Sequence, residues 1–283
     1  MDLAAIRRQV IIAMFSDDLL MEKFVLKGGN ALSLVYGIGG RTSIDVDLSI
    51  PDDFNDIDEV SKRVSIALKD RFDAAGYVVF DEKFQERPSV PKPGRTERIG
   101  GYQIEFKIID REAYERLNGD LEQIRINATL VGPEQKRRFK VDISKHEFCD
   151  GKTEVELDSY TIYVYSLPML AIEKLRAICQ QMPSYKLRSN ACPRARDFYD
   201  IYCILNERAI DLCEAENLEL VRAIFEAKFV PLYLLSHIAE THDFHVVDWL
   251  AVQQSVSHRL EPFDIYFKFV VELAKRLEVA GMV

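Results

Sequence analysis

The sequence predicts an α+β protein in which a sheet-containing domain (residues 1–160) precedes a helical domain (residues 161–283). Up to Tyr165, several short segments alternate apolar and polar residues, which is typical of strands with one buried face. From Leu167 onward, the apolar residues recur with the helical period. A length of 283 residues suits two domains better than a single core.

Residues 24–42 contain the first informative pattern. The apolar run Phe24–Leu26 predicts a buried strand, and Gly28-Gly29 interrupts it. The apolar residues of 31–35 then predict one or two helical turns. Glycine allows close backbone approach, and a turn that leads into a helix presents free N–H groups. Gly28 and Gly29 are therefore candidate phosphate-binding residues.

Asp45 and Asp47 are the candidate metal ligands. Residues 43–50 alternate, so both carboxylates are expected on the face of a strand opposite its apolar side chains. Neighbouring carboxylates repel each other, and Mg²⁺ binds one or two carboxylates together with phosphate oxygens. We therefore predict that Asp45 and Asp47 bind two Mg²⁺ ions, with Mn²⁺ as the alternative metal. Ser43 shares this face and is a candidate phosphate ligand.

The remaining elements of the first domain follow from the same periodicities. We expect helices over 2–21, 57–72 and 111–127, strands over 77–80, 102–108 and 137–144, and a hairpin over 154–165. Asn118-Gly119 is a predicted break in the third helix. Residues 86–101 hold prolines and glycines and predict a loop. In the strand over 137–144, Asp142 lies on the polar face.

The second domain is predicted to be helical throughout. Pro168 suits the first turn of a helix through Ile178, which leaves Lys174 partly exposed. Arg194 opens the next helix, which carries Asp197 and Asp200 near its start. Further helices are expected over 218–229, 233–239, 246–256 and 263–279. Four bases near the second helix, together with two in the 86–101 loop, are candidates for a phosphate-binding channel or a solvated surface: Lys186, Arg188, Arg194, Arg196, Arg95 and Arg98.

Composition excludes some classes of function. The net charge of −9 argues against general coating of a polyanion, although a local basic groove is compatible with it. The sequence contains no stretch of 18 uncharged apolar residues, so no membrane span is expected. The N-terminus lacks the pattern of a secretory signal. Five scattered cysteines without a CxxC predict reduced, mostly buried thiols. A cytoplasmic protein is expected.

Four ordered motifs resemble a known family. The string GGNAL…YG…RTSIDVDL is similar to the AbiEii/AbiGii toxin family, within the DNA polymerase β-type nucleotidyltransferase superfamily. LPMLAIEKLRAICQQ resembles the third motif of the family, and RARDFYDIY resembles the fourth. The resemblance implies a polymerase β-type core with a mixed sheet, followed by a helical domain.

The resemblance also implies roles for individual residues. Asp45 and Asp47 would hold the metals, and Asp142 would complete the second metal site or accept a proton. Lys174 would contact the phosphates of the nucleoside triphosphate (NTP), and Asp197, or in second place Asp200, would be the essential acid. Arg41 is a weaker candidate for nucleotide binding, because it could simply pair with a nearby acid.

The implied activity is transfer of a nucleoside monophosphate from an NTP, as the toxin of a toxin–antitoxin pair. In some relatives the acceptor is the 3′ end of tRNA, so RNA and a cognate antitoxin are the expected partners. Two alternatives stay open: transfer to a protein or small molecule, as in antibiotic adenylyltransferases, and a nucleotide-binding module without turnover.

Overall fold

A mixed sheet of seven strands forms the centre of the molecule, in the order β3-β4-β5-β2-β1-β7-β6. The computed structural model describes residues 2–40, 43, 45–88, 99–131, 136–187 and 190–282. Two strand pairs are parallel, β2 with β5 and β1 with β7, and the other pairs are antiparallel. The sheet and the helices after it confirm the predicted α+β fold.

The strands are β1 (Val25–Lys27), β2 (Val46–Ser49), β3 (Tyr77–Arg87), β4 (Gly101–Asp110), β5 (Phe139–Ser144), β6 (Lys152–Leu157) and β7 (Tyr160–Tyr165). Among them lie the helices α1 (Leu3–Phe15), α2 (Asp18–Lys23), α3 (Gly28–Asn30), η1 (Ala31–Tyr36), α4 (Ile57–Ala74), α5 (Arg111–Arg116) and α6 (Leu121–Asn127). The chain then continues as α7 (Leu167–Cys179), α8 (Ala195–Glu207), α9 (Ala215–Ala227), η2 (Leu232–Thr241), α10 (His242–His245), η3 (Val246–Asp248), α11 (Trp249–Ser255), α12 (Phe263–Leu277) and η4 (Glu278–Met282).

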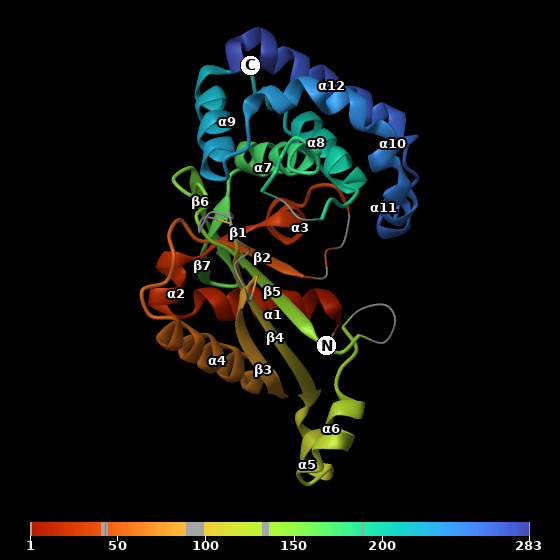
Figure 1. Cartoon of the computed structure of the whole chain (residues 1–283). Coiled ribbons are helices and arrows are strands. Elements are labelled where there is room, and N and C mark those ends of the chain that lie inside the picture. Colours follow the sequence, from red (N-terminus) through yellow and green to blue (C-terminus); the bar gives the residue numbers. More distant parts are fainter. Residues whose placement is uncertain are drawn as a thin grey trace.

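Most helices form two groups, and α5 and α6 lie apart from both, beyond the ends of β3 and β4 (Figure 1). Helices α1 and α4 pack together and cover one face, toward which the buried side chains of β2, Val46 and Leu48, project. Helices α7 to α12 gather at the other end, next to α3. The odd positions of β5 are buried and the even ones half-buried, as the alternation predicts. This alternation leaves Asp47 and Asp142 on the side of the C-terminal helices.

Several predicted elements are wrong in extent. The strand expected over 77–80 is β3, which continues to Arg87, so both ends of the loop expected over 86–101 lie in strands. The helix expected over 2–21 breaks after Phe15, because the Asp17 carboxylate accepts a hydrogen bond from the Leu20 N–H at 3.1 Å and starts α2. The strand expected over 43–50 is only β2, so Ser43 and Asp45 precede it. Its partner β1 ends at Lys27, because Gly28 turns the chain with φ +71°.

Other predictions are confirmed closely. The helix over 111–127 is divided into α5 and α6 around Asn118-Gly119, and β6 and β7 form the expected hairpin. Cys149, Cys179 and Cys203 are buried free thiols, whereas Cys192 is exposed. The domain boundary at residue 160 stays a prediction. In the part of the chain that the structure describes, no helix combines the length and the apolar character that crossing a bilayer requires.

Candidate active site

A row of four polar residues crosses the sheet on adjacent strands. Lys27 on β1 lies opposite Asp47 on β2, and Asp47 lies opposite Asp142 on β5. Asp142 in turn lies opposite Gln103 on β4. Residues directly opposite each other on neighbouring strands share a face of the sheet, so the four side chains project from the same side.

The ionised forms of Asp47, in this row, and of the nearby Asp45 are disfavoured. Burial raises the pKa of Asp47 to about 6 despite the opposing effect of Lys27, and Asp142 adds to the rise. Burial and Asp142 also raise the pKa of Asp45. The Gln103 amide donates to Asp142 Oδ1 at 2.8 Å and orients that carboxylate. A ligand that brings positive charge would therefore be stabilised here.

Asp45 is held by the segment that follows Gly28. The Asn30 side-chain amide, which is fully buried, donates to the backbone carbonyl of Asp45 at 2.6 Å. The Ser43 hydroxyl lies 3.5 Å from the same oxygen. These contacts connect the glycine turn to the chain just before β2, so that Asp45 and Asp47 stay near the turn.

Lys174 lies in a chain of alternating charges between α7 and α8. Its Nζ is 2.7 Å from Asp200 Oδ2 and 3.3 Å from Asp197 Oδ1, and Arg194 lies 3.3 Å from Asp197 Oδ2. The predicted partial exposure of Lys174 is wrong, because only 4% of the residue is accessible. Helix α8 packs over α7 and covers the lysine with two acids from one helix face.

A cavity of about 230 Å³ connects these two groups. Its lining combines Lys27, Gly28, Gly29, Ser43, Asp47 and Ser144 from the core with Glu173, Lys174, Arg194, Arg196 and Asp197 from the helices. Eight of the residues predicted from the sequence therefore meet at one cavity. Six belong to the predicted site and two to the predicted phosphate channel: Gly28, Gly29, Ser43, Asp47, Lys174 and Asp197, with Arg194 and Arg196. Four of the lining side chains are cationic and three are carboxylates, so the lining has a small excess of positive charge, which suits an anionic ligand.

The other predicted residues lie elsewhere. Asp142 lies beside Asp47 in the row, and Asp45 precedes β2, but neither lines the cavity. Asp200 is buried behind Lys174. Arg41 lies outside the described residues, as do three bases of the predicted phosphate channel: Arg95, Arg98 and Arg188.

Sequence reasoning assigned no site role to Lys27, Gln103 or Glu173. Lys27 directly precedes the glycine turn and Glu173 directly precedes Lys174, so proximity to a motif was the available signal. Gln103 had no comparable signal. It meets Asp142 only through the pairing of β4 with β5, which joins positions 39 residues apart.

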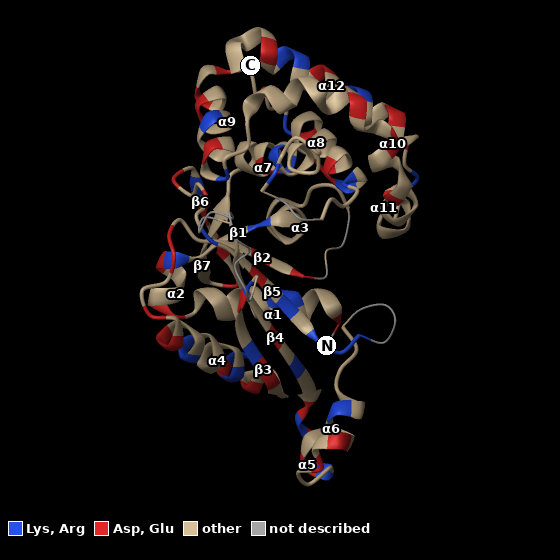
Figure 2. Cartoon of the chain, in the orientation of Figure 1, with Lys and Arg blue, Asp and Glu red and all other residues tan. Residues whose placement is uncertain are grey.

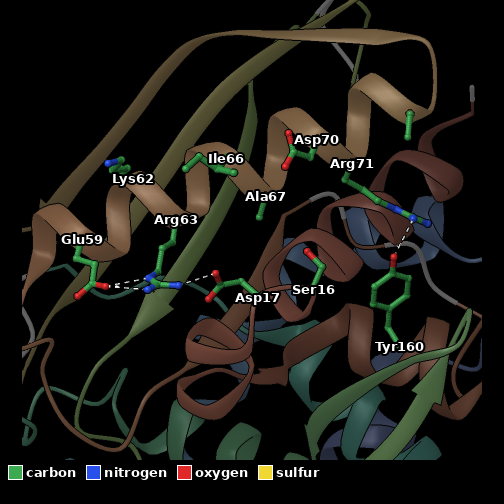
Figure 3. Close-up of a pocket in the computed structure, with 11 residues that line it drawn as sticks. Ser16, Asp17, Glu59, Lys62, Arg63, Ile66, Ala67, Asp70, Arg71 and Tyr160 are labelled. Carbon is green, nitrogen blue, oxygen red and sulfur yellow. Dashed lines mark hydrogen bonds and ion pairs between the residues drawn. The ribbon is translucent and has the colours of Figure 1, made fainter.

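A second cavity, of about 640 Å³, shares no lining residue with the first. It lies between α4, the start of α2 and Tyr160 of β7 (Figure 3). Arg63 in its wall is bound by Glu59 and Asp17, and Arg71 contacts the Tyr160 hydroxyl. The exposed side of α4 carries both signs of charge along its length (Figure 2). This larger cavity lacks the carboxylate row, so the smaller one is the candidate active site.

The metal-binding capacity of the row can be judged from its donors. Among the described residues, no three His, Cys, Asp or Glu side chains are grouped so as to hold an ion by themselves. Mg²⁺ needs only one or two carboxylates when phosphate oxygens complete its shell. Asp47 and Asp142, in register on adjacent strands, fit that requirement, with Asp45 as a further carboxylate.

Gly28 provides the space for the Asp47 carboxylate. A Cβ at Gly28 would collide with the Asp47 carboxylate, and its φ of +71° is unfavourable for other residues. We expect Gly28→Ala to lower the free energy of unfolding by about 2–3 kcal/mol in urea titrations, from strain plus collision. Gly76→Ala is the matched control, because Gly76 has φ +80° but open space around it. Equal losses in the two variants would contradict the collision.

Comparisons with known proteins bear on the family and the fold of the chain. The sequence model of the family described as "Nucleotidyl transferase AbiEii toxin, Type IV TA system" matches residues 10–267. No curated protein matches the chain.

Two solved structures are similar. The crystal structure of JHP933 from Helicobacter pylori superposes with a TM-score of 0.51 at 16% identity, over 97% of this chain and 90% of that chain. The crystal structure of an antigenic nucleotidyltransferase-like protein from Paracoccidioides brasiliensis gives a TM-score of 0.36 at 15% identity, over 90% of this chain and 93% of that chain. At such identity, the likeness to JHP933 supports the fold alone.

Proposed function

Because the chain belongs to the AbiEii nucleotidyltransferase toxin family of type IV toxin–antitoxin systems, we propose that it transfers a nucleoside monophosphate from an NTP to RNA, with the 3′ end of tRNA as the acceptor. The observation that carries this proposal is the Lys27–Asp47–Asp142–Gln103 row beside a cavity with four cationic side chains. A cognate antitoxin would neutralise the activity in the cytoplasm, where NTPs and tRNA occur.

The cavity suits the triphosphate. Arg196 is exposed at its wall and has no ion-pair partner among the described residues, so its charge is available to a phosphate. Lys174 reaches the same cavity, but Asp197 and Asp200 compensate its charge and fix its position. The Gly28-Gly29 turn and Ser43 would contact phosphate oxygens from the opposite wall.

The reaction is an in-line displacement at the α-phosphorus. The acceptor hydroxyl oxygen forms the new P–O bond, the bond to the bridging oxygen breaks, and pyrophosphate leaves. The Gln103 amide donates a hydrogen bond to Oδ1 of Asp142. Oδ2 of the same carboxylate is therefore available to take the proton of the acceptor hydroxyl or to bind a cation. Lys174 and the arginines would stabilise negative charge as it moves onto the leaving pyrophosphate.

Asp45, Asp47 and Asp142 would hold the divalent metal, Mg²⁺ or Mn²⁺, which when bound supplies charge neutralisation and activates the attacking hydroxyl. The chain's own contribution is to keep these carboxylates on one side of a rigid sheet. The raised pKa values of Asp45 and Asp47 are consistent with a site that binds a cation.

Incubation with each α-³²P-labelled NTP, Mg²⁺ and total tRNA tests the proposal on a denaturing gel. We expect wild-type protein to label tRNA, and Asp45→Ala and Lys174→Ala to reduce labelling at least about 100-fold, because each removes charge from the site. Asp52→Ala and Lys275→Ala are matched controls, since both residues are exposed and outside the cavity.

Parallel incubations with total protein and with aminoglycosides separate the alternative acceptors. Label confined to protein or drug would overturn the RNA acceptor but keep nucleotidyl transfer. Nucleotide binding without label or pyrophosphate release from wild-type protein would favour the module without turnover.

A further inference from the structure

The start of α8 brings Arg194, Arg196 and Asp197 to the candidate active site. The first N–H groups of a helix have no partner within the helix and need an external acceptor. Arg194 occupies the N-cap position, and its side chain makes no capping hydrogen bond. The orientation of this first turn therefore depends on groups outside α8.

Two side chains from the C-terminal helices supply the missing acceptors. His245 Nδ1 accepts a hydrogen bond from the Arg194 N–H at 3.0 Å, and Asp248 Oδ1 accepts one from the Ala195 N–H at 3.1 Å. They are 51 and 53 residues away in sequence. Consecutive N–H groups are thus held by a single short segment, the end of α10 and η3.

The environment of His245 is specialised for this contact. The residue is fully buried, with its ring 5.1 Å from that of Phe198 on α8 and 5.0 Å from that of Phe244. Its Nε2 has no partner among the described residues, so the bond to Arg194 is the one described hydrogen bond of the imidazole. Burial lowers its pKa to about 4, which keeps the ring neutral and Nδ1 able to accept.

We propose that His245 and Asp248 are positioning residues for nucleotidyl transfer, which hold the first turn of α8 so that Arg194 and Arg196 face the triphosphate. This inference rests on the proposed function. Without the two acceptors, the first turn frays, and the arginines lose their fixed direction toward the cavity. Binding of the phosphates then weakens, although neither positioning residue touches the substrate.

The test compares an apolar replacement with one that keeps the acceptor. In His245→Asn, the amide oxygen takes the place of Nδ1, whereas His245→Leu fills the space without an acceptor. Asp248→Asn and Asp248→Ala form the second pair. We expect the Leu and Ala variants to raise the KM for the NTP and the Kd for pyrophosphate by about tenfold, and the Asn variants to stay near wild type.

Separate measurement of KM and kcat distinguishes a positioning role from a simple loss of folded protein. A smaller folded fraction lowers the apparent kcat and leaves KM unchanged, whereas misplaced phosphate ligands raise KM.

Hydrogen exchange of peptides that cover residues 190–200 reports directly whether the first turn of α8 is capped. Exchange should be about tenfold faster in the Leu and Ala variants alone. His237→Leu and Asp243→Ala are exposed neighbours that control for general changes in this region.

The results distinguish this inference from the proposed function. Unchanged KM and Kd in the Leu and Ala variants, or Asn variants as impaired as these, would overturn the positioning role. Absence of transfer by wild-type protein would overturn the proposed function, and the pyrophosphate Kd and the exchange data would still decide the positioning role. If wild-type protein also fails to bind pyrophosphate, both are wrong.

Discussion

Asp47→Asn is expected to reduce nucleotidyl transfer by about 10³-fold while the melting temperature of the metal-free protein stays the same or rises. Asp47 is central in the polar row, between Lys27 and Asp142. An amide keeps the shape of the side chain but binds divalent cations poorly, so the metal-dependent step would be lost.

The expected melting temperature of Asp47→Asn follows from the raised pKa of Asp47. Burial and Asp142 disfavour the charged form of Asp47, with Lys27 in opposition, so a neutral amide removes an unfavourable charge. Sites built for function commonly carry such a cost in stability. Calorimetry with and without Mg²⁺ measures it, and Mg²⁺ should stabilise wild-type protein but not the variant. Asp52→Asn, an exposed acid nearby, is the control. A variant that keeps full activity, or that unfolds at a lower temperature, would contradict the assigned role.

Glu147→Gln is expected to lower the free energy of unfolding by about 3–5 kcal/mol, the largest stability effect that the structure predicts. The Glu147 carboxylate is buried among three cations, at 2.9 Å from Arg176, 3.2 Å from Lys27 and 3.6 Å from Lys228. These cations belong to α7, β1 and the residue after α9. Replacement by an amide would remove the counter-charge that all three cations share. Glu173 also lies 3.5 Å from Arg176 and 4.0 Å from Lys27, but a single carboxylate cannot compensate three buried positive charges.

The same carboxylate predicts how stability depends on pH. Burial alone would raise the pKa of Glu147, but Arg176, Lys27 and Lys228 outweigh it and hold the pKa well below its usual range. Its contribution is therefore complete above the ordinary carboxyl pKa of about 4.3. It declines gradually as the pH falls from that value toward the lower pKa of the folded state. Urea titrations at pH 7 and at about pH 3 measure both effects.

Glu219→Gln serves as the control for Glu147, because Glu219 is 82% exposed and lies 3.8 Å from Arg222. Its loss should change stability by less than about 0.5 kcal/mol. If Glu147→Gln changed the free energy of unfolding as little as Glu219→Gln does, the ion pairs of Glu147 would not be a major source of stability.

Much of the fold was accessible from local periodicity. The alternation of residues 139–144 predicted which side chains of β5 are buried, and Asn118-Gly119 predicted the break between α5 and α6. The glycine turn and the spacing of Asp45 and Asp47 also predict a site for phosphate and metal binding, and this stays a prediction. These features depend on neighbouring residues only, because the period of a strand or helix and the conformation of glycine are local properties.

Contacts between distant residues were not accessible in the same way. The helical pattern left Lys174 partly exposed, because nothing in α7 indicates that two acids of α8 will cover it. Gln103 and His245 carried no motif, yet one orients Asp142 and the other caps α8.

The sequence by itself thus determined the α+β architecture, the glycine turn and the paired aspartates of this family member. Only the tertiary structure decided the register that places Lys27, Asp47, Asp142 and Gln103 in one row. The reason is physical. Strand register and helix packing are set by the burial of many side chains at once, so the partner of a polar group is chosen by the whole core and not by the residues beside it in the chain.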